Sequence, residues 1–366
     1  MAAIIKKPAV SKGMSMKDLL GQFQKDYGED IGTVGGSLVN SARIPTGLFP
    51  LDLALGGGFP VNKVSTIYGP ESSSKTNIAL LAIANFQRQF PELTCVFIDV
   101  ENSYDPDWAG LLGVNKDKIV VIKPSYGEQV VDMAESALYT PDCGIVVIDS
   151  LAAVLTTREM NNSAEIANVG GATLLIGSLC RKTTNALMAA EKAGRKSTLI
   201  YINQIRSKVG VVMGNPETLP GGNAPKFQSN IVLRVYGKNV MDPKVSKVMP
   251  VLKQVQFKVA KWKCPVLCAT GMFSMATIAH AGLQVGQCDD FNTVSEYLKS
   301  FGDFEKDPKK GWTILGDHYP VIKEFEAKLF GDPVFGQLVR AKIINRMLEG
   351  GKMLAEGDEA GEGAEA

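Results

Sequence analysis

The 366-residue sequence has almost no net charge, because 39 lysines and arginines are balanced by 38 aspartates and glutamates. A protein that binds nucleic acid through a high overall positive charge is therefore excluded, and any such site must be a local surface. The sequence also lacks an apolar run long enough to cross a bilayer, and residues 1–7 lack the apolar centre of a secretory signal. These absences predict a cytoplasmic protein with no membrane partner.

Cysteine and histidine are scarce, with six cysteines scattered along the chain and only two histidines. Cys264 and Cys268 are the one closely spaced pair, which gives weak support for a structural zinc site. Cys95 and Cys143 lie in or beside apolar, strand-like runs, where a thiol acts as a small hydrophobic group. We therefore expect reduced, buried cysteines.

The chain is organised around residues 69–76, which read Gly-Pro-Glu-Ser-Ser-Ser-Lys-Thr. An apolar run precedes this loop and a helical pattern over residues 77–90 follows it, which is the setting of a phosphate-binding loop. Backbone N–H groups and the helix N-terminus would bind the phosphates of ATP. Lys75 would reach the β- and γ-phosphates, and the Thr76 hydroxyl would hold Mg²⁺. The alternative is a serine-rich loop that ends in Lys-Thr by coincidence.

One position departs from this motif. Glycine normally precedes the lysine, and this chain has Ser74 there. Glycine is favoured where the backbone needs a positive φ or a close approach, so we expect Ser74 to strain the loop or to change nucleotide affinity.

Short apolar strands alternate with helical patterns over residues 44–202, which predicts an α/β fold with a mostly parallel, twisted sheet flanked by helices. Beyond residue 231 the strands come without long helices, which indicates an antiparallel extension of the same sheet. The domains we expect are an N-terminal helix and linker for subunit docking (1–43), an ATPase core (44–269), a small C-terminal α/β domain (270–350) and a disordered acidic tail (351–366). The tail either keeps the protein soluble or competes with DNA phosphates for basic groups.

Two strands are expected to end in acids that join the phosphate loop. Asp149 follows an apolar strand and would hold the hydration shell of Mg²⁺. Asp99 and Glu101 end another strand, and strand alternation places them on one face, so spacing alone does not choose between them. We take Glu101 as the base that activates water, because it lies nearer the carboxyl end, where ligands bind in open α/β sheets.

Gln204 and Arg206 end a further strand, where the amide of Gln204 would sense the γ-phosphate. A long glycine-rich loop, 207–224, follows this strand, and a second such segment, 161–173, follows the strand of Asp149. Long irregular loops in compact domains are usually functional or disordered, so we expect both to become ordered with a ligand.

These motifs together resemble the RecA-type DNA recombinases of bacteria and phages. The phosphate loop is joined, in family order, by Leu51-Asp-Leu-Ala-Leu-Gly, Phe97-Ile-Asp-Val-Glu, Asp105-Pro, Ile202-Asn-Gln-Ile-Arg, Gly214-Asn-Pro-Glu-Thr and Gly221-Gly-Asn-Ala. The resemblance is densest over residues 44–236 and thinner in the C-terminal module.

The resemblance implies a RecA-like phosphate-loop ATPase core and a role for each motif. The catalytic residues that it implies are Glu101, Lys75, Gln204, Lys261 and Lys263. The residues implied to bind ATP are Gly69, Pro70, Glu71, Ser72, Ser73, Ser74, Lys75, Thr76, Asp105, Trp108 and Asp149, with Thr76 and Asp149 also holding Mg²⁺ through water. The residues implied to bind DNA are Val169, Gly170, Arg181, Arg206, Lys208, Met213, Gly221 and Gly222.

Further expectations concern assembly and activity. Lys261 and Lys263 resemble lysines that reach ATP across a subunit interface, and the N-terminal helix would dock on the neighbouring subunit. The resemblance implies a homo-oligomeric helical filament on single-stranded DNA, exchange with double-stranded DNA, and DNA-stimulated ATP hydrolysis in DNA repair and the SOS response. Loader or single-strand-binding proteins would be its partners.

Two further departures and two competing functions remain. Met213 stands where an aromatic residue is usual, and Trp262 where a small polar residue is usual. Ser74 leaves open a scaffold that binds nucleotide and DNA but barely hydrolyses ATP. A ring-forming helicase on the same core is the other alternative. Lys261, Lys263 and the glycine-rich loop 207–224 argue against it, because they resemble the filament-forming family.

Overall fold

The computed structural model describes residues 14–28, 42–161, 170–207, 217–280, 282–307 and 311–361. The chain divides into two compact units, residues 1–42 and 43–366. The first contains helix α1 (Met16–Tyr27), which begins with a capping box in which Ser15 and Asp18 each bind the other's backbone N–H. Within the described residues, no helix combines the length and the apolar character that a membrane span requires.

The second unit is built on an eight-stranded sheet. In spatial order its strands are β12 (Thr270–Ala276), β11 (Leu252–Trp262), β10 (Ile231–Val240), β3 (Val64–Gly69), β7 (Thr198–Gln204), β6 (Cys143–Asp149), β4 (Thr94–Asp99) and β5 (Ile119–Ile122). Strands β10 to β5 run parallel to their neighbours, whereas β11 and β12 are antiparallel. The expected α/β fold with an antiparallel extension is therefore confirmed.

The boundary drawn at residue 270 differs from this topology. Strand β12 pairs with β11 from Leu252↔Ala276 to Lys258↔Thr270, so it is the edge strand of the core sheet and not the start of the C-terminal module. Sequence pattern did not reveal this, because a strand's partner is chosen by distant pairing and not by its own residues.

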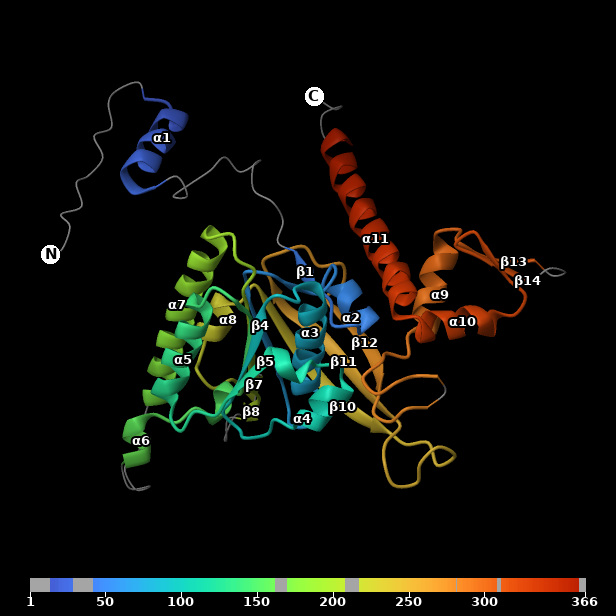
Figure 1. The fold of residues 1–366 in the computed structure, drawn as a ribbon. Helices are drawn as coiled ribbons and strands as arrows, with labels where there is room; N and C mark the ends of the chain where they lie inside the picture. Colours follow the sequence, from blue (N-terminus) through green and yellow to red (C-terminus); the bar gives the residue numbers. More distant parts are fainter. Residues whose placement is uncertain are drawn as a thin grey trace. The chain divides into compact units, whose positions relative to one another are not determined.

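Helices cover both faces of the sheet (Figure 1). Helix α3 (Lys75–Gln89) packs on one face, whereas α5 (Gly127–Tyr139) and α7 (Gly171–Lys192) lie beside each other on the other. Strand β6 shows why both faces are apolar: Ile145 and Val147 belong to the α3 core, whereas Val146 and Ile148 belong to the core under α5 and α7.

Short elements complete the core. They are β1 (Arg43–Ile44), α2 (Phe49–Ala54), β2 (Phe59–Pro60), α4 (Pro106–Leu111), α6 (Thr157–Asn161), β8 (Arg206–Ser207), β9 (Glu217–Thr218) and α8 (Ala224–Gln228). Single 3₁₀ turns lie at Lys116–Lys118 and Leu151–Ala153.

A C-terminal group of elements surrounds a third apolar cluster. They are α9 (Phe291–Ser300), β13 (Phe304–Asp307), β14 (Gly311–Ile314), β15 (Asp317–Tyr319), α10 (Ile322–Gly331) and α11 (Pro333–Gly361). The cluster also includes Phe49 and Leu53 of α2, so this module shares a core with the domain built on the eight-stranded sheet. Helix α11 is assigned as far as Gly361, and the disorder expected from residue 351 stays a prediction.

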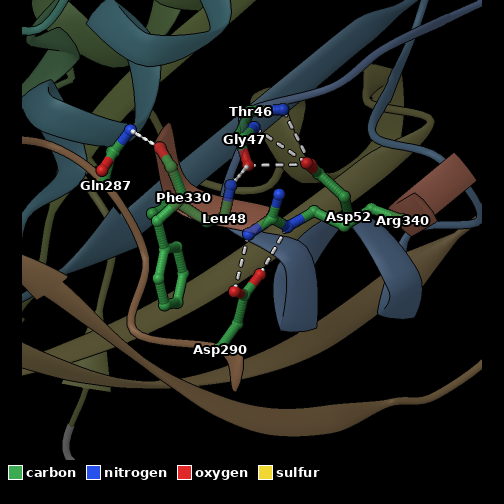
Figure 2. A network of polar contacts seen from close by, with 8 residues as sticks. All are labelled: Thr46, Gly47, Leu48, Asp52, Gln287, Asp290, Phe330 and Arg340. Carbon is green, nitrogen blue, oxygen red and sulfur yellow. Dashed lines mark hydrogen bonds and ion pairs between the residues drawn. The ribbon is translucent and has the colours of Figure 1, made fainter. Parts of the chain in front are cut away.

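A polar network fastens this module. Figure 2 shows its members: Thr46, Gly47, Leu48, Asp52, Gln287, Asp290, Phe330 and Arg340. Arg340 of α11 donates to both oxygens of the buried Asp290 carboxylate, at 2.6 and 2.7 Å. Asp52 accepts from the backbone of Thr46 and Gly47, and burial raises its pKa to about 7.

Candidate functional site

The phosphate loop has the expected strand–loop–helix form, between β3 and α3. Lys75 is 7% exposed, and its Nζ donates to the Pro70 carbonyl oxygen at 2.6 Å. Burial lowers the pKa of Lys75, since desolvation disfavours the ammonium. Gly69 permits a close approach, because a Cβ there would lie 2.2 Å from the Val235 carbonyl oxygen. The side chain of Lys75 thus folds back along the loop. In the nucleotide complex the same ammonium is expected to bind phosphate instead.

Ser74 is held in the left-handed conformation, with φ 70° and ψ 21°. Serine rarely adopts this region and glycine adopts it freely. Its buried Oγ has no hydrogen-bond partner among the described residues. Ser72 also has a positive φ, 57°, but is exposed. The left-handed backbone conformation of Ser74 is therefore the kind of strain that we expected from serine at this position.

Thr76 and Asp149 meet at the expected magnesium position. The Thr76 hydroxyl donates to Asp149 Oδ2 at 2.6 Å, from the start of α3 to the end of β6. Asp149 is 2% exposed, and burial raises its pKa to about 6. Hydroxyl and carboxylate oxygens are ligands suited to Mg²⁺ and its bound water.

The two acids at the end of β4, Asp99 within the strand and Glu101 beyond it, have different surroundings. Asp99 is buried and accepts from the backbone N–H groups of Ser103 and Tyr104, at 2.9 and 3.0 Å, so it holds the turn that follows. Glu101 is exposed and lies beyond the last residue of β4, where the chain turns toward Asp149. The expectation that strand alternation places both acids on one face is therefore wrong, since the strand ends at Asp99.

Glu101 meets Gln204 across the ends of β4 and β7. Gln204 Nε2 donates to Glu101 Oε1 at 2.7 Å, and the Ser150 hydroxyl donates to the same oxygen. The structure thus brings together the candidate base and the candidate γ-phosphate sensor, which lie 103 positions apart in the sequence. Sequence reasoning did not single out Ser150, although it directly follows Asp149.

Asp105 and Trp108 lie at the start of α4. Asp105 caps this helix by accepting from the backbone of Asp107 and Trp108, at 2.8 and 2.9 Å. Trp108 Nε1 donates to Asn77 Oδ1 at 3.0 Å, which ties the indole to the first turn of α3. Asn77 lines the phosphate pocket, so Trp108, one of the residues implied to bind ATP, is held beside it.

Lys261 and Lys263 are not among the residues that line this pocket. Both ammonium groups donate to the carbonyl oxygen of Phe227, at 2.9 and 3.0 Å, near the C-terminal end of α8. Burial, with the nearby charge of Lys263, lowers the pKa of Lys261. Their action on a neighbouring subunit stays a prediction.

Three of the residues expected to bind DNA, Gly170, Gly221 and Gly222, lie at the first turns of α7. Gly170 (φ 93°) directly precedes this helix, and Gly221 (φ 83°) packs so closely that a Cβ would lie 2.5 Å from Ile176 Cγ2. Arg181 is exposed on α7. Arg206 is exposed and donates to the Ala152 carbonyl oxygen at 3.1 Å.

The rest of the expected DNA site is placed in part. Gly222 has φ 64°, and a Cβ there would lie 3.4 Å from Thr173. Val169, Lys208 and Met213 lie outside the described residues. The described parts of both loops therefore adjoin the same end of α7.

Comparison with known proteins identifies the family. Residues 14–276 match the family described as the RecA N-terminal domain. The Protein RecA of Symbiobacterium thermophilum is 34% identical over 343 residues, which cover 88% of this chain and 92% of that protein. The Protein RecA of Oceanobacillus iheyensis is 42% identical over 59% of this chain and 61% of that protein. That of Lactococcus lactis subsp. cremoris strain MG1363 is 36% identical over 70% of this chain and 68% of that protein. The chain therefore belongs to the RecA family of recombinases.

Proposed function

We propose that this protein is an ATP-dependent recombinase that forms helical filaments on single-stranded DNA and exchanges strands with homologous double-stranded DNA. The contact between Gln204 and Glu101 is the observation that carries this proposal. It joins the candidate base to β7, the strand that leads into the 207–224 loop. Nucleotide state and DNA binding would therefore share one switch.

The nucleotide site fits ATP with Mg²⁺. Lys75 and the N-terminus of α3 offer positive charge to phosphates, and Thr76 with Asp149 offers oxygen ligands to the metal shell. Bound Mg²⁺ would neutralise charge that develops on the phosphates. Glu101, freed from Gln204, would accept a proton from the attacking water.

The switch follows from a competition for Gln204. Its amide now donates to Glu101, and a γ-phosphate would offer a more strongly charged acceptor. Two residues later, Arg206 begins β8, which pairs with β9 within the 207–224 loop. A turn of Gln204 toward phosphate would therefore move the base of the loop expected to contact DNA.

The DNA surface would bind the backbone of a single strand. Arg206 is exposed at the base of the 207–224 loop, Arg181 is exposed on α7, and both would pair with phosphates without reading sequence. Lys261 and Lys263 would leave the α8 carbonyls in the filament and reach the ATP of the adjacent subunit. Loader and single-strand-binding proteins would be its partners in the cell.

A weakly hydrolysing scaffold is the second candidate, and the positive φ of Ser74 favours it. The test is ATP hydrolysis with and without single-stranded DNA over a range of protein concentrations. We expect a steep, DNA-dependent rise, because the trans lysines complete the site only in a filament. A flat rate near zero would reject the recombinase in favour of the scaffold. Closed rings that unwind DNA without strand exchange would identify a helicase instead.

A further inference from the structure

The phosphate pocket has a second wall that the sequence did not reveal. One side is formed by residues 72–77 of the phosphate loop and α3. The other side is formed by Asn239 of β10, Lys253 of β11 and Thr277, which directly follows β12. A positively charged side chain far from the motif therefore lines the pocket.

Glycine brings this wall close to the loop. A Cβ at Gly237 would lie 2.7 Å from Lys253 Cε and 2.9 Å from both the Ser72 carbonyl oxygen and Ser73 Cα. The side chain of Lys253 therefore passes over Gly237, next to the loop backbone. Any larger residue at position 237 would push β10 and the phosphate loop apart.

The register of the sheet orients Lys253. Asn239 of β10 lies directly opposite Lys253 of β11, and the lysine Nζ donates to Asn239 Oδ1 at 2.9 Å. Lys253 shares its strand face with Val255 and Phe257, which pack in the core under α3. This is the face on which the phosphate loop and α3 lie.

The charge of Lys253 is not neutralised within the described residues, where no carboxylate lies within ion-pair distance of its ammonium. Asn239 supplies an uncharged acceptor, which orients the ammonium without neutralising it. Burial lowers the pKa of Lys253, as expected for an ammonium that has lost water and gained no counter-charge. Such a group is suited to bind an anion that enters the pocket.

We propose that Lys253 binds the phosphate chain of the nucleotide within its own subunit, so that the pocket holds the polyanion between two lysines, Lys75 and Lys253. This proposal rests on the proposed function of the phosphate loop. Asn239 acts as a positioning residue that holds the ammonium toward the pocket. The alternative is a solvated lysine that lies at the pocket rim and contributes nothing to binding.

The test is nucleotide binding by the full chain, measured by calorimetry for ATP, ADP, AMP and inorganic tripolyphosphate. Lys253→Met removes the charge, and Lys258→Met is the matched control, since Lys258 is exposed on the other face of the same strand. We expect Lys253→Met to weaken ATP and tripolyphosphate by about tenfold, as for one charge-assisted hydrogen bond. AMP should change least, and Lys253→Arg should restore most of the ATP affinity.

The outcomes separate this proposal from the one on which it rests. Equal ATP affinity in Lys253→Met, Lys258→Met and the unaltered protein overturns the role of Lys253 alone. Unaltered protein that binds neither ATP nor tripolyphosphate overturns the phosphate-loop assignment itself. A uniform loss over all four ligands, or a loss that Lys253→Arg does not restore, indicates a folding defect and also overturns the proposal. Thermal unfolding of each variant checks that the fold is intact.

Discussion

Replacing Ser74 by glycine should stabilise the nucleotide-free protein. Ser74 has φ 70° and ψ 21°, and this region costs a residue with a Cβ about 1 kcal/mol more than glycine. Its buried hydroxyl lacks a partner among the described residues, and such a group costs about 1–3 kcal/mol. The greater entropy of glycine in the unfolded chain offsets about 0.5–1 kcal/mol. The net gain is about 1–3 kcal/mol.

The assay is denaturant unfolding of the nucleotide-free protein, in which the midpoint should rise while the slope stays constant. Ser72→Gly is the matched control, because Ser72 has a φ of 57° but an exposed side chain. The control relieves the same backbone conformation without removing a buried hydroxyl, so its gain should be at most about 0.5 kcal/mol. A Ser74→Gly variant that is no more stable than the original protein, or that gains no more than Ser72→Gly, would refute the reasoning.

Three further predictions test the base, the trans lysine and the C-terminal network. Glu101→Gln should lower the steady-state ATPase rate by about 10²–10⁴-fold with nucleotide affinity nearly unchanged, and a near-normal rate would remove Glu101 from the mechanism. Lys261→Ala should lower DNA-stimulated hydrolysis by at least about 10²-fold while nucleotide binding by the monomer persists; equal loss of both would mean that the lysine does not act in trans. Arg340→Met should cost about 3–5 kcal/mol in denaturant unfolding, because it leaves the Asp290 carboxylate buried and unpaired. That loss should shrink as the pH falls, since burial already raises the pKa of Asp290 and protonation removes the charge; a loss independent of pH would contradict this account.

The sequence by itself determined the phosphate loop and the strand ends around it. Residues 69–76 are contiguous, and their function depends on local backbone form, so the strand–loop–helix pattern was enough to place Lys75 and Thr76. Asp149 and Gln204 were placed because parallel strands bring their carboxyl ends to one edge of a sheet. The positive φ of Ser74 was likewise expected from the glycine that it replaces.

Only the tertiary structure separated residues with the same local pattern. Asp99 and Glu101 are two positions apart, and the difference between them arises where β4 ends and where Ser103 and Tyr104 direct their N–H groups. Ser150 reaches Glu101 only because β6 and β4 pair side by side in the sheet.

The antiparallel extension was decided in the same way. Strand β12 belongs to the core because it pairs with β11, and Lys253 faces the phosphate loop because β11 pairs with β10 in one register. A shift of one residue would turn Lys253 to the opposite face of the sheet. Pairing between strands distant in sequence sets that register, and no local pattern in the chain encodes it.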